Sequence, residues 1–302
     1  MNPKVDIILP IYKPDKKVYK AINSVLNQTY ANWHLYIIDD ASKDDSLELI
    51  KKKYQDFNTK ITYLQLNKNR RAAGARNYAI NKGKGEFISF IDQDDIWIND
   101  KLKQQTAYLK KTGLDIVHGN LLFIDNSGNI IRKDTFESEN NTRRKINWSN
   151  IENLELANML LLRPNIRIIS AMIRRNIFQK IGGYKEQFFG GEDMILFFEL
   201  AMKGQIGYID KVLFKRRFHK NNTVIKNRNV RLKGYIKALH YLKHNYTSID
   251  HSIYKKRLTS KEFAMIKTNI TRRKIIPALI GIIRLLMFNP IFFFKYFKRT
   301  LH

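Results

Sequence analysis

Short apolar strands and amphipathic helices alternate through the first hundred residues, and this alternation restricts the fold more than any other feature. The strand-like segments are Val5–Pro10, Leu35–Asp39, Ile61–Leu66 and Phe87–Asp92. The helix-like segments between them are Lys16–Asn27, Ser46–Tyr54 and Ala72–Asn81. Such a succession forms βαβ units, whose right-handed crossovers place the strands parallel in one sheet. We therefore predict an α/β fold with an open, mostly parallel twisted sheet flanked by helices.

The pattern changes after about residue 112. Asp115–Asp125 and Ile130–Lys133 predict a hairpin around the turn at 126–129. A strand is expected at Ile166–Ile173, a helix at Met194–Met202 and extended chain at Ile206–Phe218. From about residue 225 onward the pattern is helical only. We expect a domain over residues 1–220, divided near residue 112, and a helical extension over residues 221–302.

Functional side chains gather where the predicted strands end. Pro10 and Tyr12 follow the first strand, Asp39 and Asp40 end the second, and the string Asp92-Gln93-Asp94-Asp95 ends the fourth. In an open parallel sheet, ligands bind beyond the carboxyl ends of the strands, which meet at one edge. We therefore expect a tyrosine and two acidic clusters on the same rim.

The Asp92–Asp95 string predicts a site for a divalent cation. Two carboxylates two residues apart can share Mg²⁺ or Mn²⁺, which prefer oxygen ligands and also accept phosphate oxygens. Without a cation, carboxylates this close would repel one another. The alternative is that Asp94 or Asp95 caps a helix that begins at Ile96 and that the other carboxylates are solvated.

Positive charge is concentrated at the C-terminal end of the chain. The net charge is +28, and residues 211–302 contain 23 Lys and Arg against only Asp250 and Glu262. Such a surface attracts nucleic acid or an anionic membrane. No helix-turn-helix pattern, RNA-binding signature or zinc spacing is present, so we expect no nucleic-acid partner. The chain has no cysteine and its first residues lack a secretory signal pattern, which fits a cytoplasmic location.

The apolar run from Ile275 to Phe294 lies within this basic region. Arg284 near its centre makes a membrane span costly, and two shorter segments at about Ile275–Phe288 and Ile291–Phe297 fit better. Flanked by basic residues, they are typical of interfacial helices that lie on an anionic leaflet. We expect peripheral association with the inner face of the cell membrane. Packing on the rest of the chain, or an oligomer contact, is the alternative.

Four segments in order resemble the family 2 glycosyltransferases. They are "DIILPIYKPDKKVYKAINSVLNQTYANWHLYIIDDASKDDS", "ARN", "GEFISFIDQDD" and "GGYKEQFFGGED", within about residues 5–220. The resemblance implies a GT-A fold, with a nucleotide-binding half at about 1–112 and an acceptor-side half at about 113–220. The membrane-associating role expected for residues 221–302 depends on their charge and apolar run instead. It also implies an inverting hexosyltransferase of bacterial surface-glycan synthesis, which uses a UDP-sugar and a divalent metal, Mn²⁺ or Mg²⁺.

The resemblance assigns donor-binding roles to the strand-end residues. Pro10 and Tyr12 match the segment that lies against the nucleotide base, although Tyr12 could instead pack in the core. Asp39, or its neighbour Asp40, matches the carboxylate that binds the uracil or ribose edge. Arg76, in the "ARN" string with Asn77, matches a position near the base and diphosphate.

The resemblance also implies the metal ligands and the base. Asp94 matches the usual metal ligand, and Asp92 lies nearer the ribose and shares the metal site. Asp193, in Glu192-Asp193, matches the general base, and its carboxylate could also stabilise the N-terminus of the following helix. His219, in "RRFH", matches a position that often completes the metal or diphosphate site, although it could be a plain surface residue.

Two departures from the family pattern bear on specificity. Many relatives have glycine where this chain has Arg71, which could contact the diphosphate or lie on the surface. The Gln-x-x-Arg-Trp string of processive members is absent, which favours transfer of a single sugar to a glycan or lipid-linked acceptor. The remaining alternatives are a basic nucleic-acid-binding protein or a non-catalytic scaffold, and the presence of Asp92, Asp94 and Asp193 argues against a scaffold.

Overall fold

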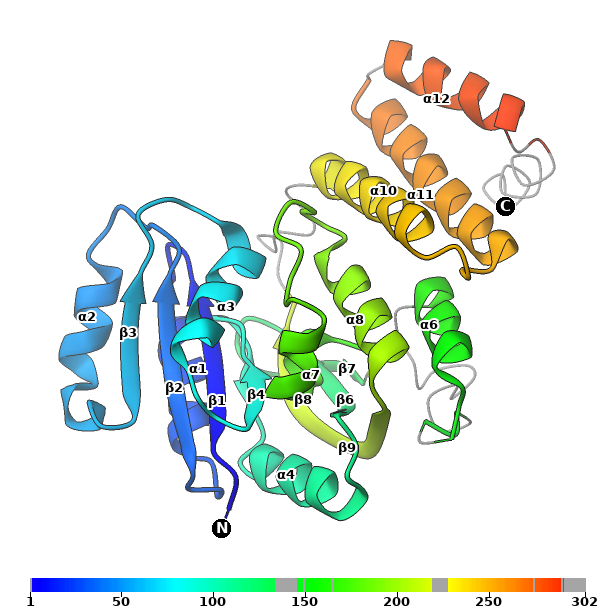
Figure 1. Cartoon of the computed structure of the whole chain (residues 1–302). Coiled ribbons are helices and arrows are strands. Elements are labelled where there is room, and N and C mark those ends of the chain that lie inside the picture. The colour runs from blue at the N-terminus through cyan, green and yellow to red at the C-terminus, as the bar shows by residue number, and fades with distance from the viewer. Residues whose placement is uncertain are drawn as a thin grey trace.

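Four parallel strands form the N-terminal half of a mixed sheet in the computed structural model (Figure 1). The structure describes residues 2–133, 146–148, 150–163, 166–218, 228–273, 275–288 and 290. The parallel strands are β1 (Val5–Ile11), β2 (Trp33–Asp39), β3 (Ile61–Gln65) and β4 (Phe87–Phe90), in the order β3-β2-β1-β4. The side chains of β1, β2 and β4 are almost all buried because helices cover both faces, whereas those of the edge strand β3 are mostly half-buried.

The second half of the sheet mixes directions. It adds β8 (Met172–Arg174), β6 (Ile116–Ile124), β9 (Ile206–Arg217) and β5 (Ile96–Trp97), and β7 (Ile130–Lys133) pairs with β6 outside this order. β8 is antiparallel to both β4 and β6, whereas β6 and β9 are parallel. The sheet therefore continues from the parallel half into the second half without a break, which places the two halves around one edge.

The helices α1, α2, α3 and α8 follow the predicted amphipathic segments closely, whereas α6 and α7 were not predicted. The described ones in the body are α1 (Lys17–Leu26), α2 (Ser46–Lys53), α3 (Arg71–Lys82), α4 (Lys101–Thr112), α6 (Asn153–Leu162), α7 (Arg175–Lys180) and α8 (Glu192–Lys203). Short 3₁₀ turns occupy Gln55–Phe57 and Ile168–Ser170. α4 ends at Gly113, whose φ of 73° is the left-handed conformation that glycine adopts freely at a helix end.

The predicted open α/β sheet is confirmed, as are the hairpin of β6 with β7 and the long strand β9. Two of the predicted strand boundaries were wrong. β4 ends at Phe90, so Asp92 lies in the loop after it, and the segment 166–173 is a 3₁₀ turn followed by a strand of three residues. Apolar composition could not distinguish the strand residues from the turn residues beside them, because a buried turn is as apolar as a buried strand.

In its described residues, the C-terminal extension contains three long helices that step outward from the body (Figure 1). They are α10 (Arg228–Asn245), α11 (His251–Thr271) and α12 (Ile275–Phe288), and the last matches the predicted segment. α10 packs against α8, α11 against α6, and α12 against α11. The helix α12 buries Ala278 and Leu285 against α11. Along the described helices, none combines the length and apolar character needed to cross a membrane.

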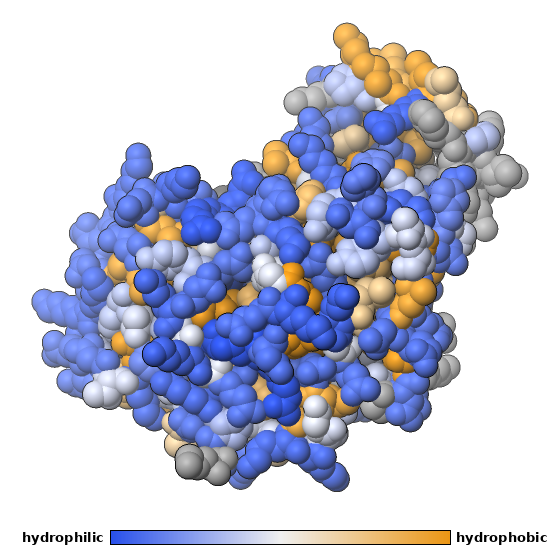
Figure 2. Space-filling model, in the orientation of Figure 1, coloured by the Kyte–Doolittle hydropathy of each residue, from blue (hydrophilic) through white to orange (hydrophobic). Residues whose placement is uncertain are grey.

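A patch of apolar side chains remains exposed on α12 and at the end of α11. It comprises Ile270, Ile275, Ile276, Leu279, Ile280, Ile283 and Met287, each more than half exposed. Figure 2 shows this group at the tip of the extension, where the rest of the visible surface is largely hydrophilic. We call it the α12 patch. Contiguous exposed apolar surface of this kind usually marks an interaction site.

Candidate active site

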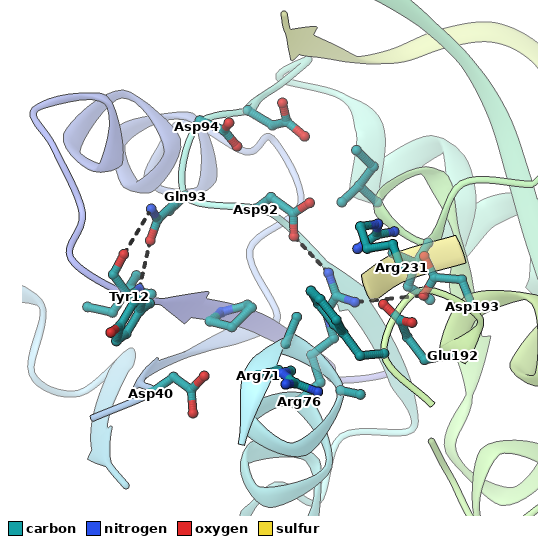
Figure 3. Close-up of a pocket in the computed structure, with 18 of the residues that line it drawn as sticks. Tyr12, Asp40, Arg71, Arg76, Asp92, Gln93, Asp94, Glu192, Asp193 and Arg231 are labelled. Atoms are coloured by element: carbon teal, nitrogen blue, oxygen red, sulfur yellow. Dashed lines mark hydrogen bonds and ion pairs between the residues drawn. The ribbon is translucent and has the colours of Figure 1, made fainter. Parts of the chain in front are cut away.

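A cavity of about 620 Å³ opens at the carboxyl edge of the parallel strands. Its walls come from the end of β1, the loop after β4, the start of α3, the loop before α8 and the first turn of α10 (Figure 3). Pro10, Tyr12, Asp40, Arg76, Asp92, Asp94 and Asp193 all line it. The fold therefore brings together most of the residues that the sequence analysis singled out, from segments far apart in the chain.

Arg76 joins the two sides of this cavity. Its guanidinium donates to Asp92 over 2.7 Å and lies 3.8 Å from Asp193, as Figure 3 shows. Arg76 is only 4% exposed, whereas the carboxylate groups of its partners face the cavity. Burial alone would lower the pKa of Arg76, but Tyr184, Asp92 and Asp193 together raise it, so the guanidinium stays cationic.

Tyr184 forms a second connection between Arg76 and Asp193. Its hydroxyl accepts a hydrogen bond from Arg76 and donates one to Asp193, each at 3.3 Å. Burial raises the pKa of Tyr184 well above its ordinary value, so the hydroxyl remains protonated and able to donate. Asp193 is thereby held in one orientation by two groups on the same side.

The loop after β4 is held by Arg217 of β9. The backbone N–H of Arg217 donates to Asp95, and its side chain donates to the carbonyl of Asp94 and to two carbonyls of the β6–β7 turn. Asp95 is buried, and burial followed by the nearby charges of Asp94 and Asp92 raises its pKa well above the usual range. Of the three aspartates, Asp95 is therefore the structural one, while Asp92 and Asp94 line the cavity.

Asp193 and Glu192 begin α8, which follows the glycine pair 190–191. Burial, and then the charge of Asp193, raises the pKa of Glu192, which Arg231 on α10 partly offsets. Glu192 also accepts a hydrogen bond from the backbone of Gly190, so it stabilises the turn. Both carboxylates line the cavity, but Glu192 is tied to the turn at Gly190 whereas Asp193 contacts Arg76 and Tyr184.

At the end of β1, Tyr12 is tethered to the loop after β4. Gln93 accepts from the backbone N–H of Tyr12 over 2.9 Å and donates to its carbonyl over 3.4 Å. The Tyr12 ring is 45% exposed and lies at the cavity, so it does not pack in the core. The sequence analysis gave Gln93 no role, and only the register of the two loops reveals one.

The two adjacent aspartates at the end of β2 have different environments. Asp39 accepts hydrogen bonds from Ser42 and Gln65 and does not line the cavity. Asp40 lines the cavity and accepts from the backbone of Arg70. Burial raises the pKa of Asp40, and these backbone hydrogen bonds oppose the shift. Of these two aspartates, Asp40 is the one that lines the cavity.

The donor set at Asp92 and Asp94 suits a metal only together with a substrate. Among the residues that the structure describes, no three His, Cys, Asp or Glu side chains lie close enough to hold a metal ion. Mg²⁺ and Mn²⁺ commonly bind through one or two carboxylates plus substrate phosphates and waters. Two oxygen-donor side chains on an open cavity wall fit that pattern. The third predicted ligand, His219, lies outside the described residues.

Sequence reasoning missed several residues of the cavity. Tyr184, Phe189 and Arg231 line or support it; the first two lie in the quoted segment at 182–193 but received no role, and Arg231 lies outside every quoted segment. Arg70 forms a bidentate ion pair with Glu186, which also accepts from Asn77 and so fastens α3 to the loop before α8. The only available signal was the clustering of aromatic and acidic residues around 184–193.

Solved structures share this architecture. The S. aureus TarS fragment 1–349, in complex with UDP-GlcNAc, is 17% identical with a TM-score of 0.64, over 88% of this chain and 74% of that one. Mannosyltransferase PcManGT from Pyrobaculum calidifontis, in complex with GDP-Man and Mn²⁺, is 13% identical with a TM-score of 0.62, over 100% of this chain and 80% of that one. At this identity the likeness establishes the GT-A fold.

Curated relatives are more similar in sequence. The Escherichia coli UDP-Glc:alpha-D-GlcNAc-diphosphoundecaprenol beta-1,3-glucosyltransferase WfgD is 40% identical over 41% of this chain and 47% of the relative. An uncharacterized glycosyltransferase of Rickettsia bellii is 30% identical over 81% of this chain. The matches span only between 33% and 65% of such relatives. The family model "Glycosyl transferase family 2" matches residues 6–182, and the chain therefore belongs to glycosyltransferase family 2.

Proposed function

We propose that this chain moves a single sugar from a UDP-sugar to a hydroxyl group of a lipid-linked or glycan acceptor, with inversion at the anomeric carbon. The observation that carries the proposal is the pair of carboxylates joined by Arg76. Asp92 and Asp193 contact the same buried guanidinium from the two sides of one cavity. A donor diphosphate beside Asp92 and an acceptor hydroxyl beside Asp193 would then meet between them.

The donor would lie along the strand ends, with its base near Pro10, Tyr12 and Asp40. UDP is favoured because WfgD is named for a UDP-glucose donor and a TarS structure contains UDP-GlcNAc. PcManGT contains GDP-Man, so GDP is the competing nucleotide. A divalent cation, Mn²⁺ or Mg²⁺, would be held by Asp94 and Asp92 and would neutralise charge on the leaving diphosphate.

Asp193 would act as the general base. The acceptor oxygen forms a bond to the anomeric carbon while the bond from that carbon to the phosphate oxygen breaks, and UDP leaves with the electron pair. The acceptor proton passes to Asp193, which Arg76 and Tyr184 hold in position. Attack from the side opposite the leaving group inverts the configuration.

The extension would bring the enzyme to its acceptor. We assign the transfer reaction to residues 1–220 and membrane association to residues 221–302. The α12 patch would enter the interfacial region of the inner leaflet, and the surrounding Lys and Arg residues would bind anionic headgroups. This would place the enzyme at the cytoplasmic face, in synthesis of a bacterial surface polysaccharide.

Calorimetric titration with UDP tests the donor site. Wild type should bind UDP with Mn²⁺ present and should lose this binding in EDTA. Asp94→Asn should remove the part of UDP binding that depends on the metal. Asp56→Asn is the matched control, because Asp56 is exposed and lies before the start of β3, at the opposite edge of the sheet from the cavity. Tighter binding of GDP than of UDP would identify GDP as the donor nucleotide. Failure to bind either nucleotide would overturn the proposal.

Vesicle sedimentation tests the membrane role. Wild type should bind phosphatidylglycerol vesicles better than phosphatidylcholine vesicles, and less well in high salt. The double variant Ile276→Asp with Ile280→Asp should lose most of this binding. The double variant Ile130→Asp with Ile131→Asp, which changes equally exposed isoleucines on β7, should not. Equal loss in both would refute a specific role for α12.

A further inference from the structure

The cavity contains two arginine side chains whose guanidinium groups donate no hydrogen bond to a described carboxylate, although Arg231 lies near enough to Glu192 to lower its pKa. Arg76 is engaged by Asp92 and Asp193, and Arg217 donates to backbone carbonyls. Arg71 and Arg231 also line the cavity. In the described part of the chain, neither of their guanidinium groups forms a hydrogen bond or an ion pair with another side chain.

Phe189 brings these two cations together. The guanidinium carbon of Arg71 lies 4.3 Å from the centre of the Phe189 ring, and that of Arg231 lies 5.3 Å from it. The ring positions both side chains without neutralising either, because a cation–π contact leaves the hydrogen-bond donors unused. Two cations held beside one ring form a surface that suits an anionic group.

The backbone at Arg71 supports a functional role for its side chain. Arg71 has a φ of 58°, a left-handed conformation that is uncommon for residues other than glycine. Its side chain is exposed at the cavity although the backbone is strained. Such outliers persist where the surroundings enforce them, and they concentrate at binding sites.

Arg231 is fixed relative to the proposed base by unusually close packing. Gly234 on α10 lies against the carbonyl of Phe189, and Gly190 lies against the backbone of Arg231. A side chain at either glycine would collide with that backbone, so α10 and the loop before Asp193 move as one unit. Figure 3 shows Arg231 beside Glu192 and Asp193, on the side of the cavity away from Tyr12 and Asp40.

We infer that Arg71 and Arg231 form a cationic subsite that binds a phosphate or diphosphate group of the acceptor. The inference rests on the proposed function, because it places the acceptor on the Asp193 side and the donor diphosphate on the Asp94 side. Guanidinium groups bind phosphate oxygens through paired, charge-assisted hydrogen bonds. α10 would therefore be part of the active site, and it would connect the acceptor phosphate to the helices that carry the α12 patch.

Direct binding of a phosphate probe tests the subsite. Protein saturated with UDP and Mn²⁺ is titrated with decyl diphosphate, inorganic pyrophosphate and the neutral amphiphile decyl maltoside. Arg231→Gln and Arg71→Gly should each weaken decyl diphosphate binding about tenfold or more. Lys233→Gln, which removes an exposed cation from the same helix, should bind as wild type does. Decyl maltoside binding should not change in any variant.

Two readouts separate binding from folding and donor effects. Arg71→Gly should unfold no more readily than wild type, because glycine adopts this φ without strain. The Kd for UDP should stay unchanged in both arginine variants. A preference for decyl diphosphate over pyrophosphate would identify a lipid-linked phosphate, and equal affinity would identify any acceptor phosphate.

Two results would contradict the subsite, and a third would contradict the proposed function alone. Unchanged decyl diphosphate binding in both arginine variants would remove the subsite. A parallel loss of UDP affinity would assign the arginines to the donor. Absence of UDP binding in wild type would remove the proposed function alone, because the decyl diphosphate titration repeated without UDP still tests the two arginines.

Discussion

The two edges of the parallel strands each contain an Asp–Arg ion pair, and the pairs differ in exposure. At the amino edge, Asp6 at the start of β1 is fully buried and contacts Arg175 and the backbone N–H of Gly85. At the carboxyl edge, Asp92 pairs with Arg76, but its side chain is 38% exposed. The side chains of Arg76 and Arg175 are 5% and 12% exposed, so the two pairs differ mainly in the exposure of the carboxylate.

The difference separates a folding interaction from a candidate catalytic one. The Asp6–Arg175 pair joins β1 to α7 and is closed to solvent, so no ligand can reach it. The Arg76 pair presents Asp92 and Asp193 to a cavity while the cation stays protected beneath them. Breaking the first should change stability alone, and altering the second should change activity more than stability.

The largest expected effect is at the carboxyl edge. Asp193→Asn should lower transfer about 10³- to 10⁴-fold, about 4 to 5.5 kcal/mol, because the acceptor proton then has no base. UDP binding and the unfolding midpoint should remain close to wild type. Glu155→Gln, an exposed carboxylate on α6, is the control. Transfer at the wild-type rate would remove Asp193 as base.

Arg175→Leu should have the largest effect on stability. It leaves Asp6 buried without its cation, which costs about 3 to 4 kcal/mol in the free energy of unfolding. Urea denaturation measures the loss, and UDP affinity at low urea should be unchanged. Glu86→Gln breaks the exposed pair with Arg174 and should cost less than about 1 kcal/mol. Similar losses of unfolding free energy in the two variants would show that burial does not decide how much such a pair stabilises the protein.

Arg76→Lys should lower activity more than stability, unlike Arg175→Leu. Lysine keeps the charge but cannot contact Asp92 and Asp193 with two separate nitrogens, so we expect about a 10- to 100-fold loss of transfer. Stability should fall by only about 1 kcal/mol, because the charge is retained. Arg70→Lys, at the pair with Glu186 whose side chains are about one third exposed, is the matched change at the residue that precedes α3. A larger loss of stability than of activity would make Arg76 a folding residue like Arg175.

Tyr184→Phe should give the smallest effect. It removes only the hydroxyl between Arg76 and Asp193, so transfer should fall about 3- to 10-fold through kcat rather than KM. Tyr246→Phe removes a hydroxyl that donates to Glu199 at the same distance of 3.3 Å, outside the cavity. Steady-state kinetics on both variants should show a loss only for Tyr184. An unchanged kcat would show that Tyr184 does not orient the base.

Local sequence patterns were sufficient for the parallel strands, for the helices between them and for α8 and α12, but not for β5, α6, α7 or the turn at Ile168–Ser170. The parallel order followed from βαβ alternation, and α12 begins and ends where its apolar run predicted. Patterns were not sufficient for Asp39 and Asp40, because adjacent carboxylates look alike until Ser42 and Gln65 are seen to bind one of them. The role of Gln93 was hidden for the same reason, since its partner lies 81 residues away.

By itself the sequence determined the fold class, the strand-end position of the acidic residues and the basic, apolar character of the C-terminal end. These properties depend on periodicity and on the chemistry of neighbouring residues, which a linear pattern records. Only the tertiary structure decided that Arg76 joins Asp92 to Asp193 and that Arg231 of α10 reaches the same cavity. Asp193 and Arg231 lie more than a hundred positions from Arg76 in the chain, and packing of helices against the sheet edge sets the distances between them.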